Sequence, residues 1–142
     1  MAPRLDTVTR WDASKLPRFI ESIEDREIKE LVVRVALGAM MQRDVGKDDL
    51  TSYIEGCRTL GDLKETCLDG VVWGLLYHGP PENEYVKALD FCKAEVFASQ
   101  ERDFCYKNAF SRIDAPYPYT QEKIKEICNG VHEQYRKYCI VN

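Results

Sequence analysis

The chain has 142 residues, 44% of them hydrophobic and 31% charged, with a formal net charge of −4. This length is typical of one domain or a short array of repeats, and the mixed composition excludes both a disordered polyelectrolyte and a membrane protein. Neither sign of charge is segregated along the chain and no apolar run is long enough to cross a bilayer, so we expect no nucleic-acid partner and no membrane insertion.

Apolar residues at helical spacing dominate the chain, and the alternation typical of strands is almost absent. After a short N-terminal arm at residues 1–13, we expect a single α-helical repeat domain over residues 14–142. A helix is predicted over residues 25–42, with acidic residues near its start and a basic residue near its end, as the helix dipole prefers. Its apolar residues recur at helical spacing and are Ile28, Leu31, Val32, Val35 and Ala39.

A second long helix is predicted over residues 62–78, where the apolar stripe is wide enough for packing against two neighbours. Gly38, Gly70 and Gly74 lie inside these two helical patterns. No glycine-rich phosphate loop surrounds them, so we interpret them as positions where two helices cross closely. Further helices are expected between the glycine and proline breaks at residues 78–81, 114–118 and 129–130.

The cysteines mark an internal repeat. In each copy one cysteine closes a helical stretch, and a second cysteine with a basic residue three positions before it opens the next. The first cysteines are spaced by 35 and 36 residues and the second cysteines by 38 and 34. The predicted repeats cover about residues 14–46, 47–81, 82–117 and, truncated, 118–142.

An upstream copy of the repeat has no cysteines, and Ile23 and Val32 stand in their places. Both cysteine positions of this copy are replaced by aliphatic residues at once. We therefore expect the two positions to touch across a turn. Sulfur would join them in the later copies, and methyl groups in the first. The sequence therefore predicts disulfides within repeats, which pair Cys57 with Cys67, Cys92 with Cys105, and Cys128 with Cys139.

A second pairing arises if residues 85–112 and 120–139 form two unbroken antiparallel helices hinged at residues 116–118. Cys105 would then face Cys128, and Cys92 would face Cys139. Such a clasped pair resembles the twin cysteine-x-n-cysteine (CHCH) proteins, which implies a structural or assembly subunit of the mitochondrial intermembrane space. Only Cys57 and Cys67 have the nine-residue spacing of that family, and the glycine of residues 129–130 interrupts the second helix.

Units of about 35 residues built of two helices resemble the tetratricopeptide and Sel1-like class of α-solenoids. The tryptophan-leucine-glycine pattern of tetratricopeptides is missing. Residues 67–70 (CLDG), 87–92 (KALDFC) and 102–106 (RDFCY) are nearer to uncharacterised, cysteine-containing bacterial helical repeats, over residues 57–112. Where those repeats often carry histidine after glycine, this chain has Trp73 and Gly74. The resemblance implies a right-handed array of antiparallel helical hairpins with a binding or scaffolding surface.

The redox state follows less directly from the sequence, because six cysteines favour an oxidising compartment while the N-terminus has no signal-peptide core. Three explanations remain. The chain is a trimmed piece of an exported protein in the periplasm or outside the cell, or it reaches an oxidising compartment without a cleaved leader, or its thiols stay reduced in a cytosol.

Motifs for catalysis or metal binding are absent from the sequence. No two cysteines are closer than ten positions, which disfavours both a redox cysteine pair and a zinc site. The two histidines, His78 and His132, have no recognisable serine partner. Asp48 and Asp49 precede a predicted helix, where carboxylates favour the helix dipole. We therefore expect no enzyme, no cofactor and no metal.

Tyrosines recur at equivalent junctions between repeats, where they could form a ridge that binds a partner, or simply pack successive repeats together. We predict a protein-interaction or scaffold module whose partner is another protein or the remainder of a longer chain. The array stops at Asn142 without a full closing helix, which favours a fragment. The candidate binding residues are Trp73, Tyr77, His78, Tyr85, Tyr117 and Tyr119.

Overall fold

The computed structural model describes residues 15–47, 49–114 and 118–139, and over these ranges the backbone is helical without strands. The predicted all-α class is therefore confirmed, and the two long helices lie where the periodicity places them. The elements in chain order are α2 (Lys15–Glu21), α3 (Arg26–Asp44), α4 (Thr51–Arg58), η1 (Gly61–Leu63), α5 (Lys64–His78), α6 (Glu84–Cys92), α7 (Ser99–Ser111), α8 (Gln121–Asn129) and η2 (Glu133–Tyr138).

Local sequence explains where several helices begin and end. The Asp25 side chain caps α3 by accepting a hydrogen bond from the Ile28 backbone N–H at 3.1 Å, and Thr120 caps α8 in the same way. Gly79, with two prolines after it, ends α5 in an extended conformation. The predicted N-terminal arm at residues 1–13 lies outside the described residues.

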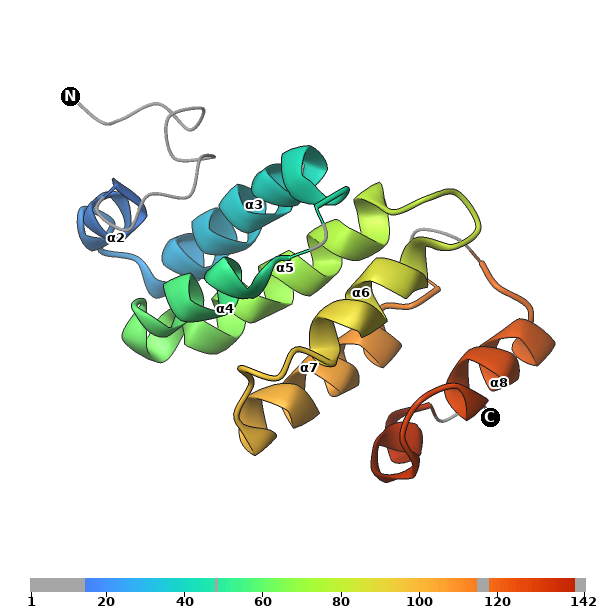
Figure 1. Cartoon of the computed structure of the whole chain (residues 1–142). Helices are drawn as coiled ribbons and strands as arrows, with labels where there is room; N and C mark the ends of the chain where they lie inside the picture. Colours follow the sequence, from blue (N-terminus) through green and yellow to red (C-terminus); the bar gives the residue numbers. More distant parts are fainter. Residues whose placement is uncertain (1–14, 48, 115–117, 140–142) are drawn as a thin grey trace.

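The long helices lie beside one another. Helix α3 packs on α5, α5 packs on α7, and α7 packs on η2, while the shorter α4 and α6 pack on α5 (Figure 1). Helices α3 and α5 run in the same direction, because Arg26 at the start of α3 bonds Asp62 just before α5, and Gly74 near the end of α5 meets Met41 near the end of α3.

Glycines allow α3 and α5 to approach closely, as the sequence predicts. A Cβ atom on Gly74 would lie 2.6 Å from the Cβ of Met41 and 3.0 Å from the Cα of Gly38. A Cβ atom on Gly70 would lie 2.9 Å from the Cβ of Leu37. Real side chains do not approach to such distances, so this contact depends on the missing methyl groups.

The structure forms the three disulfides predicted within repeats: Cys57–Cys67, Cys92–Cys105 and Cys128–Cys139. Their Cα–Cα distances are 5.4, 5.4 and 5.9 Å. The crosswise pairing of the clasped-helix alternative is not formed. Three disulfides are typical of a protein in an oxidising compartment.

The cysteine-free pair of the first copy has a different environment from the bridged cysteines. Ile23 and Val32 are only half-buried, whereas Cys57 and Cys67 are fully buried in the core. Contact between Ile23 and Val32 therefore remains a prediction.

Candidate protein-interaction surface

Helix α3 has apolar residues on two opposite sides. Val33, Leu37 and Met40 are completely buried in the core. The apolar residues that predict the helix lie mostly on the other side, where Ile28 is 51% and Leu31 59% exposed. We call this side the outer face of α3, and with one helical turn per 3.6 residues it comprises Ile28, Leu31, Val32, Val35 and Ala39.

The apolar surface continues from α3 onto the end of α5. Trp73 lies against Gly38, so closely that a Cβ atom there would be 2.5 Å from the indole ring. The ring centroids of Trp73 and Tyr77 are 4.8 Å apart, and Tyr77 is 46% exposed. Gly38 is three residues after Val35, about one helical turn, so the two lie near each other on the helix surface. The rings of Trp73 and Tyr77, which lie beside Gly38, therefore widen the apolar surface of the outer face of α3. Of the five large exposed hydrophobic residues in the described part, only Val86 lies elsewhere.

Charged residues lie at both ends of α3. Its N-terminal end carries Asp25 and the exposed Glu24 and Glu27. Its C-terminal end carries the exposed cations of Arg43 and Lys47, and both pair with the single buried carboxylate of Asp44, at 2.9 and 3.3 Å. The bond from Arg43 lowers the pKa of Asp44 well below its usual range. The exposed Asp49 follows Lys47 by two residues, so charges of both signs occur at this end of α3.

The aromatic residues predicted to bind a partner fall into two groups. Trp73 and Tyr77 lie together at the end of α5, with His78 half-buried beside them. Tyr85 and Tyr119 pack edge to face where α6 and α8 begin, with centroids 5.6 Å apart. Tyr117 lies outside the described residues.

The second group is largely internal packing. Tyr119 is buried, and its hydroxyl donates a hydrogen bond to the Glu84 carboxylate at 2.5 Å. Burial, followed by this bond to a carboxylate, raises the pKa of Tyr119. Tyr119 therefore joins the start of α8 to α6, and offers little surface to a partner.

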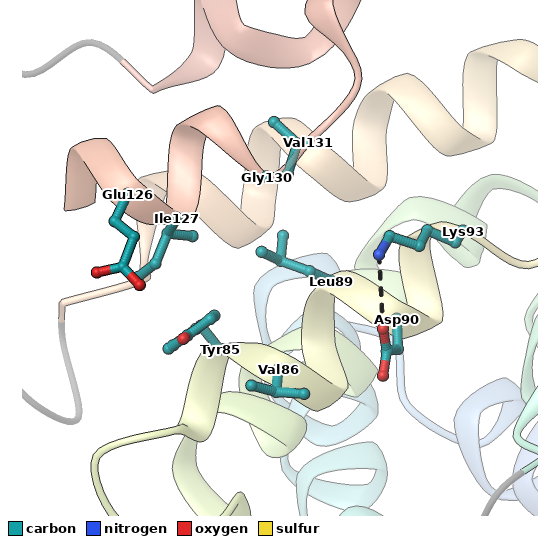
Figure 2. A pocket seen from close by; sticks show the side chains of 9 residues that line it. All are labelled: Tyr85, Val86, Leu89, Asp90, Lys93, Glu126, Ile127, Gly130 and Val131. Atoms are coloured by element: carbon teal, nitrogen blue, oxygen red, sulfur yellow. Dashed lines mark ion pairs between the residues drawn. The ribbon is translucent and has the colours of Figure 1, made fainter. Parts of the chain in front are cut away.

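A shallow groove of about 220 Å³ lies between α6 and α8. Figure 2 shows side chains from α6 on one side of it and from α8 and the following loop on the other. Buried Leu89, Ile127 and Val131 form its apolar lining, and an ion pair of 3.7 Å between Asp90 and Lys93 lies at its edge. Ligand pockets usually measure roughly 300–1,000 Å³, so this groove is small for a cofactor.

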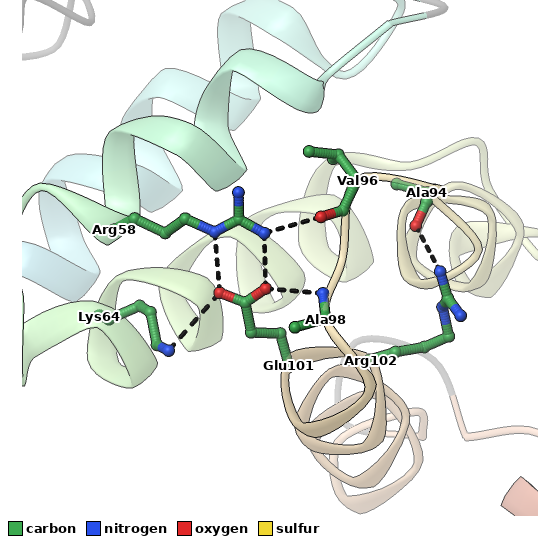
Figure 3. Close-up of polar contacts among 7 residues, drawn as sticks. All are labelled: Arg58, Lys64, Ala94, Val96, Ala98, Glu101 and Arg102. Carbon is green, nitrogen blue, oxygen red and sulfur yellow. Dashed lines mark hydrogen bonds and ion pairs between the residues drawn. The ribbon is translucent and has the colours of Figure 1, made fainter.

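Ion pairs to the buried carboxylate of Glu101, missed by the sequence analysis, join three helices. Figure 3 shows Arg58 of α4 and Lys64 of α5 converging on Glu101 of α7. Arg58 donates two hydrogen bonds to the Glu101 carboxylate, at 2.7 and 3.0 Å, and the Ala98 backbone N–H donates a third. Bonding by Arg58 lowers the pKa of Glu101 to about 2. Because its partners are 43 residues apart in the chain, no local pattern could reveal this pair.

We expect the substitution Glu101→Gln to reduce stability at neutral pH and to flatten the loss of stability in acid. The folded-state pKa of about 2 is below the ordinary value of 4.5, so the stabilisation is complete above about pH 5 and is lost as the pH falls from about 4.5 towards 2. Urea unfolding at about pH 7 and about pH 3 measures the effect. A gap between parent and variant that stays constant over this range would contradict the prediction.

Asp69 forms a second buried junction of the same kind. Arg34 of α3 donates to its Oδ2 atom at 2.9 Å, and Arg112, just after α7, donates to the same atom at 3.0 Å. Asp69 is thus held between two arginines from different elements, as Glu101 is held between Arg58 and Lys64. The contacts of both carboxylates are those of structural ion pairs.

Comparison of the chain with protein-family models, with curated proteins and with solved structures found no match. Within the described ranges, no three side chains of His, Cys, Asp or Glu are placed to share a metal ion. No described helix is long and apolar enough to span a membrane.

Proposed function

We propose that this chain is a non-catalytic protein-interaction module, and that the outer face of α3, with Trp73 and Tyr77, is its contact surface. The observation that carries the proposal is the exposure of three large aliphatic side chains along one helix, opposite its buried side. When exposed apolar residues of a folded protein lie next to one another in a patch, the patch marks a site of association more often than it arises by chance.

The proposal includes the architecture of the module: a right-handed array of helical hairpins in which each disulfide joins the two helices of one hairpin. Three observations support it. Short and long helices alternate along the described chain, and the long helices pack in succession. Polar bonds between neighbouring units recur at a separation of 35 residues, in Arg34–Asp69 and in Tyr138–Asp103.

An array of this kind explains the exposed surface. Helix α5 has the long helices α3 and α7 on its two sides, and α7 packs between α5 and η2. Helix α3 packs on α5 and contacts the short α2, and Ile28, Leu31 and Val35 on its outer face are left exposed. Solenoid ends usually carry polar residues, so an apolar end indicates a surface that is covered by a partner. We place the module in the periplasm or outside the cell, as part of a longer exported chain, in keeping with its disulfides.

A photo-crosslinking amino acid at position 31, introduced in the cell that makes the protein, tests this function. We expect a discrete adduct from position 31, because the partner covers this residue. The same group at the exposed Lys107 on α7 serves as the control and should give no adduct. Mass spectrometry of the adduct then identifies the partner as another protein or a second copy. Equal labelling at both positions, or none at position 31, would contradict the proposed function.

A further inference from the structure

We propose that Asn129 is a site of spontaneous modification, at which deamidation converts the asparagine to isoaspartate, and that the Cys128–Cys139 disulfide controls the rate. Asn129 is the last residue of α8, and Figure 2 shows Gly130 at the end of this helix. Both residues are exposed to water, and no other asparagine in the chain precedes a glycine. The site is separate from the outer face of α3, so this inference does not depend on the proposed function.

The reaction needs only these two residues and water. The Gly130 backbone nitrogen loses its proton to a base in solution and attacks the Cγ atom of Asn129. A bond from this nitrogen to Cγ forms, the bond from Cγ to Nδ2 breaks, and Nδ2 leaves as ammonia with protons from the solvent. Water then opens the cyclic imide at one of its two carbonyl groups, which gives either aspartate or isoaspartate. Overall, one water is consumed and one ammonia is released, without oxidation or reduction.

A following glycine allows this attack most readily, because it has no Cβ atom to hinder ring closure and its backbone turns freely. The chain contains two internal comparisons. Asn108 is half-buried and precedes an alanine. Asp69 precedes Gly70 and could form the same cyclic imide by losing water, but both residues are buried inside α5. Asn129 alone combines an exposed side chain with a following glycine at a helix end.

The folded turn restrains the two reacting groups. The Gly130 N–H donates a hydrogen bond to the Ile127 carbonyl at 3.1 Å, which makes this nitrogen less available for attack. The Asn129 carbonyl accepts a hydrogen bond from Arg136 at 3.2 Å, which fixes the orientation of the peptide group between the reacting residues. Ring closure rotates this peptide group, so both hydrogen bonds must break first. The rate of modification therefore depends on how often the end of α8 opens.

The disulfide closes the segment that contains both restraints. It joins Cys128, directly before the reacting pair, to Cys139, directly after η2, and Arg136 lies between them. Without the bridge, only non-covalent contacts hold η2 in place, among them the stacking of Tyr135 on Tyr106 with centroids 4.1 Å apart. Loss of the bridge releases the loop-closure constraint, so the end of α8 opens more often.

The modification differs from reduction of the bridge in being irreversible. Isoaspartate carries the chain through its side chain, so an extra carbon atom enters the backbone between Cys128 and Cys139. Its carboxylate also lies at the C-terminal end of α8, where the helix dipole disfavours a negative charge. A molecule whose bridge has stayed open is therefore marked permanently, even after the cysteines are oxidised again.

Deamidation rates in the purified protein test the inference. The parent and the double variant Cys128→Ala with Cys139→Ala are incubated in mildly alkaline buffer. Peptide mass spectrometry follows the replacement of the amide by an acid at position 129, and an isoaspartyl methyltransferase distinguishes isoaspartate from aspartate. We expect a rate at least about tenfold higher in the folded double variant than in the parent. Asn108 and Asp69 should stay unchanged.

Three controls separate the reactivity of the site from its restraint. In concentrated urea, parent and double variant should react at similar rates, because the fold is absent. Gly130→Ala should react about tenfold more slowly in urea. The folded protein accepts this methyl group, because its nearest contact would be the Ile127 carbonyl oxygen at 3.4 Å. Arg136→Ala keeps the bridge and should raise the rate in the folded protein about threefold.

The outcomes that would overturn the inference are distinct. A position 129 that stays unchanged in urea, or an Asn108 that reacts equally fast, overturns the assignment of the site. Equal rates in the folded parent and the folded double variant overturn the control by the disulfide. Circular dichroism verifies folding, and if the double variant does not fold, Arg136→Ala decides, because a rate equal to that of the parent overturns the restraint.

Discussion

Gly74→Ala should destabilise the protein by about 1–3 kcal/mol, although alanine favours a helix more than glycine does. The added methyl group would lie 2.6 Å from the Cβ of Met41, and a backbone-anchored Cβ cannot swing away as the end of a long side chain can. Helices α3 and α5 must therefore separate, which loosens the most extensive helix contact in the described structure. Urea unfolding of the oxidised protein measures the change.

Gly46→Ala is the control for this prediction. No atom lies within 4 Å of the position that its Cβ would take, so the free energy of unfolding should stay within about 0.5 kcal/mol of the parent. If Gly74→Ala instead stabilises the protein through its helix propensity, the close crossing of α3 and α5 contributes nothing to stability, and the packing described above is wrong at this point.

Replacing both Cys57 and Cys67 by alanine should lower the free energy of unfolding by about 3–5 kcal/mol. The bridge closes a loop between residues separated by 10 positions, and the chain-entropy model assigns about 3 kcal/mol to a loop of this size. Both cysteines are fully buried, so the variant also loses the packing of the two sulfur atoms in the core. Thermal and urea unfolding of the purified variant measure the loss.

The third bridge provides the comparison. Cys128 is only half-buried, whereas both cysteines of the first bridge are fully buried, so the same double replacement there should cost less, about 2 kcal/mol. Graded reduction gives an independent measurement. Alkylation and peptide mapping should find Cys128 and Cys139 labelled before the four fully buried cysteines. Earlier labelling of Cys57 would contradict this order.

The positions of the helices and the disulfide pairing were predictable because their signals are local. Apolar spacing and glycine breaks placed α3 and α5, and the joint replacement of two cysteines by Ile23 and Val32 indicated pairing within each repeat. The pairing is confirmed. A cysteine pair only about ten residues apart needs a single chain reversal, which the sequence shows directly.

The buried side of α3 was not predictable from periodicity. Two apolar stripes run along this helix, and the spacing of Ile28, Leu31 and Val35 is as regular as that of the buried Val33, Leu37 and Met40. The choice between the stripes depends on the close approach of α5, because Gly70 and Gly74 fit only against the Leu37 and Met41 side. The buried side of α3 is therefore determined by its packing against α5, and the sequence of α3 alone does not reveal it.

The bonds between helices far apart in the sequence could not be predicted either. Arg58 and Glu101 are 43 residues apart, so no spacing along the chain indicates that they form a pair. Tyr85 and Tyr119 were recognisable as junction residues, but burial against Glu84 rather than exposure to a partner is decided by where α8 meets α6.

Covalent bonds and non-covalent bonds in this molecule lie along different directions. Each disulfide joins two segments that are neighbours in the chain, while the carboxylates of Asp69 and Glu101 join helices that are far apart in the sequence. A stretching force applied between the two ends would therefore separate these distant helices, while the disulfide-bonded segments resist extension. Under mechanical load the non-covalent contacts between helices would break while the three disulfide-closed loops stay closed.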